Sequence, residues 1–255
     1  MKILCCVKIV ADFDSQSEVG WDIVGNDIDT TYYPKQINCY DASGLELALR
    51  CAQNAAEPVE LSVLTVSDGS DARFFKPLFA LGAAECSIIC TQRDLRFDPA
   101  WTALQLAAYA REGGFDYIIF GASQSIGRNG ATGALVSALL NRPCISGVTG
   151  FEETEGGLRV SLLMDEAVLT KIVLRGSVLI IDESSALPLR SPTLKQKLAV
   201  SSRTPTIIEP YDTAQTPAAP KLLRLYREEQ GGECTILPPE ELAERVLALF
   251  KGESS

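Results

Sequence analysis

The stretch "FDYIIFGASQSIGRNGATGALVSALLN" (residues 115–141) decides the fold. Its first part, residues 115–122, is an apolar run that predicts a buried strand. Its last part, residues 131–141, predicts a helix that Pro143 ends. A glycine-rich loop joins the two parts, and strands that alternate with helices in this way are typical of α/β proteins.

The same alternation fills the first 145 residues or so of the chain. Further strands are expected at residues 2–10, 59–67 and 85–91, and further helices at residues 40–55, 71–83 and 98–114. Asp41 or Ser43 is expected to cap the helix at 40–55, and Asp98 the helix at 98–114. A short hairpin is expected within residues 18–33. The pattern predicts an α/β fold, with a mostly parallel nucleotide-binding sheet and helices on both faces.

The pattern changes after Pro143. Residues 157–182 predict consecutive antiparallel strands, and residues 192–200 a short basic helix or turn. Residues 201–236 show little periodicity, and residues 238–250 predict an amphipathic helix. We therefore expect an antiparallel addition to the sheet and an extended C-terminal arm.

Composition excludes several classes of function. Lys and Arg number 23 against 33 for Asp and Glu, so a nucleic-acid partner is not expected. The chain has no histidine, which removes His-based catalysis and His-ligated metal sites; the eight cysteines form no CxxC pair and are expected to be reduced and buried. We predict no catalytic residues and no metal. No apolar run reaches the ~20 residues of a membrane span, so no direct membrane insertion is expected, and the cytoplasm is the expected location.

The loop between residues 121 and 133 has the chemistry of a phosphate site. Gly127, Gly130 and Gly133 recur at every third position and allow the backbone to approach a ligand closely. The following helix would point its free N–H groups at the loop. The loop also carries neutral hydrogen-bonding side chains and one cation, namely Ser123, Gln124, Ser125, Asn129, Thr132 and Arg128. The alternative is a glycine-rich structural turn, because neither a P-loop nor a G-x-G-x-x-G fingerprint is present.

Several stretches, in order, resemble the beta subunit of electron transfer flavoproteins. They are "KILCCVK" (2–8), "NCYDASGLELALR" (38–50), "VLTVSDG" (63–69), "ALGAAEC" (80–86), "GASQSIGRNGATG" (121–133) and "PLRSPTLKQKLA" (188–199). The resemblance implies an adenine-nucleotide-binding α/β domain at residues 1–200. It implies an arm and C-terminal helix at residues 201–255 that pack on a partner subunit.

The resemblance also implies cofactors and partners. The chain would form a heterodimer with an alpha subunit, share FAD with it, and bind AMP or a second FAD. It would carry electrons from a flavoprotein dehydrogenase and would not be an enzyme by itself. The implied nucleotide contacts are Cys6, Asn38, Cys39, Tyr40, Asp41, Asp68, Gly121, Ala122, Ser123, Gln124, Ser125, Gly127, Arg128, Asn129, Gly130, Ala131, Thr132 and Gly133. The implied docking residues for the dehydrogenase are Leu194, Lys195 and Lys197.

Each implied role has a structural alternative. Cys6 and Leu194 are also compatible with core packing, Asn38 and Asp41 with a turn and a helix cap, and Asp68 with an ordinary turn. Alternative functions are an adenylating or ATP-hydrolysing enzyme and a nucleotide sensor of similar fold.

The chain departs from the family pattern at two parts of the implied nucleotide site. Cys39 stands where the family has proline, and "GRNGAT" replaces the aspartates of the family loop. Because Arg128 makes this loop more positive, the choice between AMP and a second FAD stays open.

Overall fold

The computed structural model describes residues 1–13, 23–25, 27–123, 130–165, 167–185 and 187–213, with the single residues Leu223, Pro238, Glu241, Val246 and Leu247. The chain divides into two units, one of residues 1–21 and 29–221 and one of residues 22–28 and 222–255. In the second unit, β3 (Ile23–Val24) and β4 (Asp27–Ile28) pair as the expected short hairpin. The expected helix at 238–250 lies outside the described residues, apart from four single positions.

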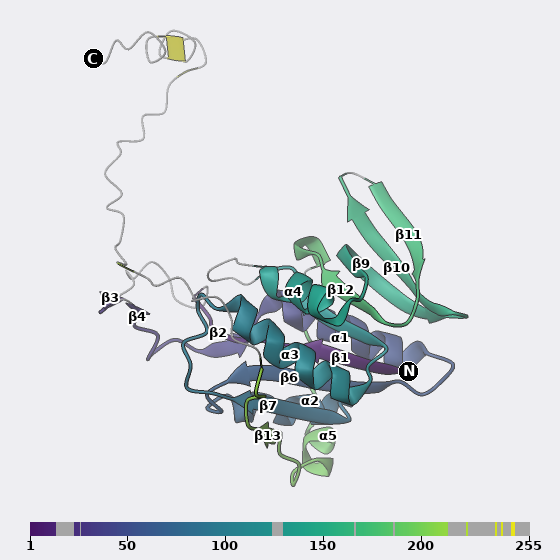
Figure 1. Cartoon of the computed structure of the whole chain (residues 1–255), viewed down its shortest axis with the longest axis horizontal. Coiled ribbons are helices and arrows are strands. Elements are labelled where there is room, and N and C mark those ends of the chain that lie inside the picture. Colours follow the sequence, from purple (N-terminus) through teal and green to yellow (C-terminus); the bar gives the residue numbers. More distant parts are fainter. Residues whose placement is uncertain are drawn as a thin grey trace. The chain divides into compact units, whose positions relative to one another are not determined.

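A nine-stranded sheet, in the order β11-β10-β9-β12-β8-β1-β6-β7-β13, organises the first unit (Figure 1). Its strands are β1 (Lys2–Cys6), β6 (Glu60–Ser67), β7 (Glu85–Cys90), β8 (Tyr117–Gly121), β9 (Cys144–Thr154), β10 (Gly157–Met164), β11 (Ala167–Val173), β12 (Ser177–Ile181) and β13 (Thr206–Ile208). The neighbouring strands from β9 through β12, β8, β1, β6 and β7 to β13 are all parallel. β10 pairs antiparallel with both β9 and β11. The predicted α/β class, with its antiparallel addition, is confirmed.

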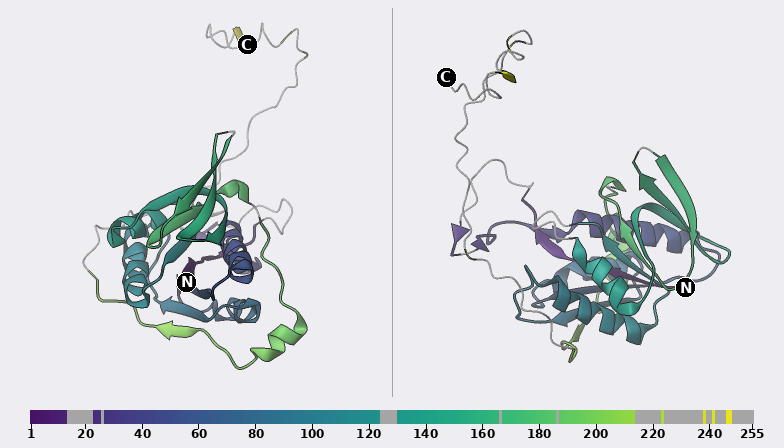
Figure 2. Two further views of the ribbon diagram at one scale, coloured as in Figure 1. Left: turned by 90° about the vertical axis from the view of Figure 1, so that its right-hand side faces the viewer. Right: turned by 45° about the horizontal axis from the view of Figure 1, so that its top comes forward.

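Helices cover both faces of the sheet (Figure 2). On one face, α1 (Cys39–Asn54) and α2 (Lys76–Leu81) pack into the core that contains Cys5, and they are joined there by buried residues of β9, β10 and β12. On the other face, α3 (Pro99–Gly113) and α4 (Ala131–Leu140) pack into the core that contains Cys6. The adjacent thiols thus point to opposite faces, as the alternation of side chains along a strand requires.

Local signals position most of the helix ends. Asp98 caps α3 by accepting a hydrogen bond from Trp101 N at 3.0 Å, and Gly114 ends that helix with φ 61°. Gly82 ends α2 with φ 119°. The cap expected for α1 is wrong, because the helix begins after Asn38, and Asp41 lies in its first turn. Ser43 is not a cap either, because its hydroxyl bonds to Leu187.

Two of the expected strands differ in the structure. The strand expected at 2–10 breaks after Cys6, and β2 (Ile9–Ala11) pairs instead with β5 (Lys35–Ile37) in a separate two-stranded sheet. β12 is not antiparallel: it returns between β9 and β8 and pairs parallel with both. All five of its residues are buried, as suits a central strand of a parallel sheet.

The sheet extends beyond residue 200. β13 lies within the segment assigned to the arm and forms the far edge of the sheet beside β7. Two 3-10 turns, at Ala72–Phe74 and Glu183–Ser185, and a short helix, α5 (Leu194–Ala199), complete the described elements. Among the described residues, no helix is long and apolar enough to cross a membrane.

Candidate functional site

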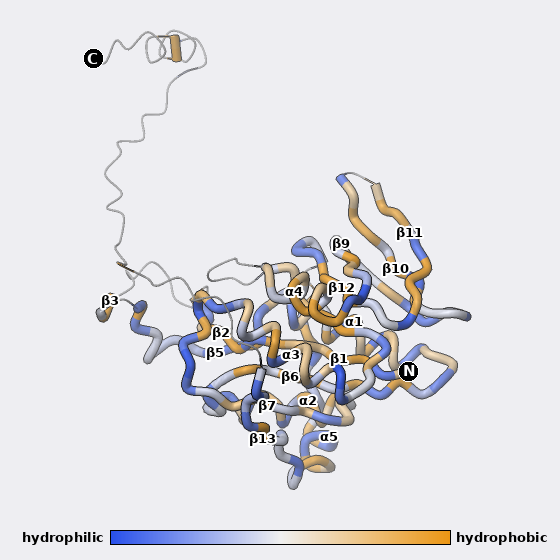
Figure 3. Tube along the Cα trace, in the orientation of Figure 1, coloured by the Kyte–Doolittle hydropathy of each residue, from blue (hydrophilic) through white to orange (hydrophobic). Residues whose placement is uncertain are grey.

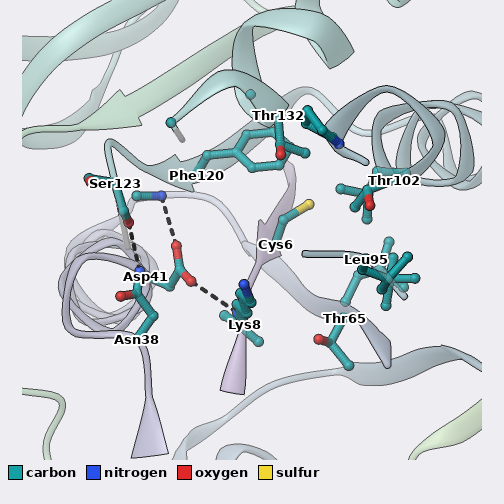
Figure 4. Close-up of a pocket in the computed structure, with 18 of the residues that line it drawn as sticks. Cys6, Lys8, Asn38, Asp41, Thr65, Leu95, Thr102, Phe120, Ser123 and Thr132 are labelled. Atoms are coloured by element: carbon teal, nitrogen blue, oxygen red, sulfur yellow. Dashed lines mark hydrogen bonds between the residues drawn. The ribbon is translucent and has the colours of Figure 1, made fainter. Parts of the chain in front are cut away.

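A pocket of about 150 Å³ lies where the strand order reverses (Figure 4). From β1, the chain proceeds to β6 and β7 on one side and later to β8 on the other side. The connections that leave the carboxyl ends of β1 and β8 therefore run to opposite sides, and open α/β sheets bind ligands at such a position. The lining residues are Cys6, Val7, Lys8, Asn38, Asp41, Leu64, Thr65, Val66, Leu95, Arg96, Pro99, Thr102, Leu106, Phe120, Gly121, Ser123, Gly130, Thr132 and Gly133.

Asp41 joins the ends of the two central strands. Its carboxylate accepts hydrogen bonds from Lys8 N at 2.9 Å and from Gly121 N at 3.0 Å. Asn38, which is 1% exposed, donates from Nδ2 to Ser123 O at 2.9 Å and from its backbone N to Lys8 O at 2.8 Å. We call these contacts of Asn38 and Asp41 the strand clamp. Because both side chains are engaged by main-chain groups, they set the shape of the pocket floor.

The clamp holds its carboxylate in an environment that disfavours charge. Burial raises the pKa of Asp41 to about 6, although hydrogen bonds from Lys8, Gly121 and Asn38 and the positive charge of Lys8 lower it. Burial also lowers the pKa of Lys8, against the opposing attraction of Asp41. The pocket floor is therefore sensitive to protonation near neutral pH.

Glycine is required at two positions of the pocket. A Cβ on Gly121 would lie 2.6 Å from Asp41 Oδ1 and 2.8 Å from the carbonyl carbon of Tyr40. Gly130 has φ 59°, and a Cβ there would lie 2.7 Å from Ala122 O. The close approach of these backbones leaves the space that the pocket occupies.

The first turn of α4 forms one wall. Gly130 precedes the helix and has no side chain with which to cap it, while Thr132 and Gly133 line the pocket. The first N–H groups of a helix lack intrahelical acceptors and carry partial positive charge. This wall is thus suited to an anionic group such as a phosphate.

The opposite wall was missed by the sequence analysis. It consists of the end of β6, with Thr65 and Val66, and of residues from Leu95 into α3, namely Leu95, Arg96, Pro99, Thr102 and Leu106. Arg96 pairs with Asp94, with 2.7 Å between Nη2 and Oδ2. Only a general rule could have predicted this wall. The carboxyl ends of parallel strands all lie at one edge of the sheet, so residues that follow different strands meet there.

The structure brings together many of the sequence-predicted residues. Those that line the pocket are Cys6, Asn38, Asp41, Gly121, Ser123, Gly130, Thr132 and Gly133. Those that do not line it are Cys39, Tyr40, Asp68, Ala122 and Ala131. Gln124, Ser125, Gly127, Arg128 and Asn129 lie outside the described residues.

Asp68 and Cys6 each also have a structural role. Asp68 is exposed, and its Oδ1 accepts a hydrogen bond from Ser70 N at 2.9 Å, as in an ordinary turn. The thiol of Cys6 is buried in the core as well as at the pocket, and burial raises its pKa well above the usual value. This thiol is therefore protonated and is not a nucleophile. Within the described ranges, no cluster of three or more His, Cys, Asp or Glu residues could hold a metal.

The predicted docking residues lie on α5, away from the pocket lining. Leu194 is 73% exposed, so the alternative that it is a core leucine is wrong. Leu198, one turn later, is 64% exposed, and Lys195 and Lys197 are exposed between and beside the two leucines. Thr193 and Gln196 form a capping box that starts this short helix.

The segment before α5 is anchored firmly. Arg190 pairs with the buried carboxylate of Glu46, with 2.6 Å between Nη2 and Oε1. Ser43 Oγ donates to Leu187 O at 3.1 Å and accepts from Leu187 N at 3.0 Å. α5 is thus presented from a fixed base on α1.

Comparison with known proteins is consistent with this geometry. A protein of Escherichia coli (strain K12) named "Putative electron transfer flavoprotein subunit YgcR" is 26% identical over 264 residues, covering 98% of this chain and 96% of the relative. The sequence profile of the family described as "Electron transfer flavoprotein domain" matches residues 27–210. Because this match spans more than half of the chain, the chain belongs to the electron transfer flavoprotein family.

Proposed function

We propose that this chain is the beta-type subunit of a heterodimeric electron transfer flavoprotein and binds an adenine nucleotide in the pocket. The observation that carries the proposal is the pocket at the strand-order reversal, which combines an apolar interior with neutral donors and the N-terminus of α4. Family membership supports a role in electron transfer.

The residues present suit such a nucleotide. The hydroxyls of Thr65, Thr102 and Thr132 supply polar contacts. Asp41, the only carboxylate among the described lining residues, is held by main-chain N–H groups. Leu95, Val66, Leu106 and Phe120 supply the apolar contacts that a base requires. A phosphate would be bound at the first turn of α4, together with loop residues 124–129.

The redox chemistry belongs to the flavin. FAD, shared with an alpha subunit, accepts and donates the electrons when it is bound. This chain would bind and orient nucleotide and present α5 to the dehydrogenase. The exposed Leu194 and Leu198 suit an apolar recess on the dehydrogenase, and the neighbouring Lys195 and Lys197 suit an acidic rim.

The identity of the pocket nucleotide is the first experiment. Coexpression with an alpha subunit from the same organism should yield a yellow heterodimer, from which nucleotides are released by denaturation and identified by mass spectrometry. One FAD with one AMP indicates an ordinary carrier, and two FAD molecules indicate the form that divides electrons between two acceptors. A colourless complex without adenine nucleotide contradicts the proposal.

A matched pair of variants tests the position of the nucleotide. Thr132→Asp adds a carboxylate in the pocket, whereas Ala134→Asp adds one to the same end of α4 at an exposed position outside the lining. Both added carboxylates lie near the N-terminus of α4, where a negative charge interacts favourably with the helix dipole, so neither change should unfold the protein. Repulsion between the added carboxylate and a phosphate is about 4 kcal/mol at 4 Å and an effective dielectric of 20. Only Thr132→Asp should therefore lose the pocket nucleotide.

A further inference from the structure

The chain that follows α5 runs along the sheet and then along α3. β13 pairs with β7, and the residues after β13 reach the helix. Tyr211 N donates to Gln105 Oε1 at 2.7 Å, and Gln105 Nε2 donates to Tyr211 O at 3.1 Å and to Thr213 Oγ1 at 3.3 Å. The hydroxyl of Tyr211 donates to Glu112 Oε2, further along the same helix, at 2.9 Å. We call residues 206–213 the strap.

Gln105 is a buried polar residue in an apolar part of the helix. It is 0% exposed, and the middle of α3 around it is mainly apolar (Figure 3). Among the described residues, all of its side-chain hydrogen bonds are made with the strap. A buried amide that loses its partners costs about 1–3 kcal/mol of stability. Release of the strap would therefore leave this amide unpaired or move α3 until water reaches it.

The same stretch of α3 forms a wall of the pocket. Thr102 lies one turn before Gln105, Leu106 directly follows it, and both of these neighbours line the pocket. The side chains of Ile208 and Tyr211 pack against the apolar cluster that contains Leu106. The strap and the pocket thus depend on one segment of one helix and on one apolar cluster.

Shared use of α3 connects docking of the strap with binding in the pocket. A ligand that contacts Thr102 and Leu106 binds best when α3 keeps the position that the docked strap supports. A ligand that prefers one of two states shifts the equilibrium toward that state. The effect is reciprocal, so the docked strap raises the affinity of the pocket by the same factor by which the ligand favours docking.

We propose that the strap couples the pocket to the C-terminal part of the chain: a nucleotide in the pocket holds residues 206–213 on α3 and so fixes the place from which residues 214–255 continue. This inference rests on the proposed function, in which an adenine nucleotide binds in the pocket. Gln105 does not line the pocket and acts as a positioning residue, through the strap on one side and the pocket wall on the other.

Hydrogen exchange of the full chain tests this coupling in the wild type. The probes are AMP and FAD, each added separately to the purified chain. The backbone amide of Tyr211, which bonds to Gln105, should exchange at least about tenfold more slowly when a probe is bound. Equilibrium dialysis of the wild type and of Thr132→Asp shows whether each probe binds in the pocket. Binding there without slower exchange at Tyr211 overturns this inference alone, whereas no binding of either probe contradicts the proposed function and this inference with it.

A matched pair of variants tests the reciprocal effect. Gln105→Met keeps a long side chain in the apolar part of α3 but removes the hydrogen bonds to the strap, so the dissociation constant of the bound probe should rise at least about fivefold. The control is Arg203→Met, just before the strap. The Arg203 guanidinium bonds to Ala83 O and Ala84 O and lies 4.1 Å from the centre of the Phe79 ring, and none of these residues is on α3. The dissociation constant of this control should stay within about twofold of the wild type. Equal dissociation constants in the two variants, whether raised or unchanged, would show that the strap does not act through Gln105, and the proposal would be wrong.

Discussion

Replacing Asp41 with asparagine tests the strand clamp through the pH dependence of stability. The ordinary pKa of this carboxyl is 3.8, and burial raises the pKa of Asp41 to about 6 in the folded chain. Between these values the folded state binds more protons than the unfolded state, so stability falls as pH rises through this window. The full difference corresponds to about 3 kcal/mol, because one pKa unit corresponds to about 1.4 kcal/mol.

The expected result is a difference in slope between two proteins. From about pH 4.5 to about pH 7, the free energy of unfolding of the wild type should fall by about 2 kcal/mol relative to Asp41→Asn, which does not titrate. The assay is urea denaturation of both proteins at several pH values. Other carboxyl groups contribute equally to both, so their effects cancel. Parallel curves over this range would refute the argument that burial outweighs the hydrogen bonds at Asp41.

Two further variants sharpen this test. Asp41→Ala removes the acceptor of Lys8 N and of Gly121 N and should cost about 1–3 kcal/mol, since each hydrogen bond contributes about 0.5–1.5 kcal/mol. Glu46→Gln tests a carboxyl group whose pKa is shifted in the opposite direction, downward. Burial alone raises the pKa of Glu46, but hydrogen bonds from Arg190 and Arg50 hold this pKa at about 2, below the ordinary 4.5. Its contribution is present above pH 4.5 and is lost as pH falls toward 2.

Three further changes probe other parts of the molecule. Gly121→Ala should destabilise the chain by about 1–3 kcal/mol in urea denaturation, because its Cβ would overlap Asp41 and Tyr40; wild-type stability would show that the clamp yields easily. Leu194→Ala, at a position 73% exposed, should leave the melting temperature unchanged while slowing reduction by the dehydrogenase in stopped-flow measurements; a lower melting temperature contradicts this role. Arg128→Asp should reduce the nucleotide content found by mass spectrometry, and full retention would show that its charge does not act on the phosphate.

Several predictions from the sequence succeeded because their signals are local. The helix α3 is framed by Asp98, Pro99 and Gly114, which act within one turn of the helix ends. The apolar run at 117–120 is buried throughout, as a strand within a parallel sheet must be. The arm at residues 201–255, the cytoplasmic location and the ligands of the pocket stay predictions.

Other features depended on residues distant in the chain. Asp41 looks like a helix cap in the sequence, yet its acceptors are used by Lys8 and Gly121, which lie 33 and 80 positions away. Local patterns cannot reveal this contact, because it exists only when β1, α1 and β8 are packed together. The wall formed by Leu95 to Leu106 was missed for the same reason.

The sequence by itself determined the alternation of strands and helices, the glycine-rich loop between β8 and α4, and the family resemblance. Only the tertiary structure decided that β12 runs parallel between β9 and β8, and that β13 closes the far edge of the sheet. It also left β11 uncovered among the described strands. The physical reason is that strand order depends on pairing between segments far apart in sequence, whereas periodicity and capping act over a few residues.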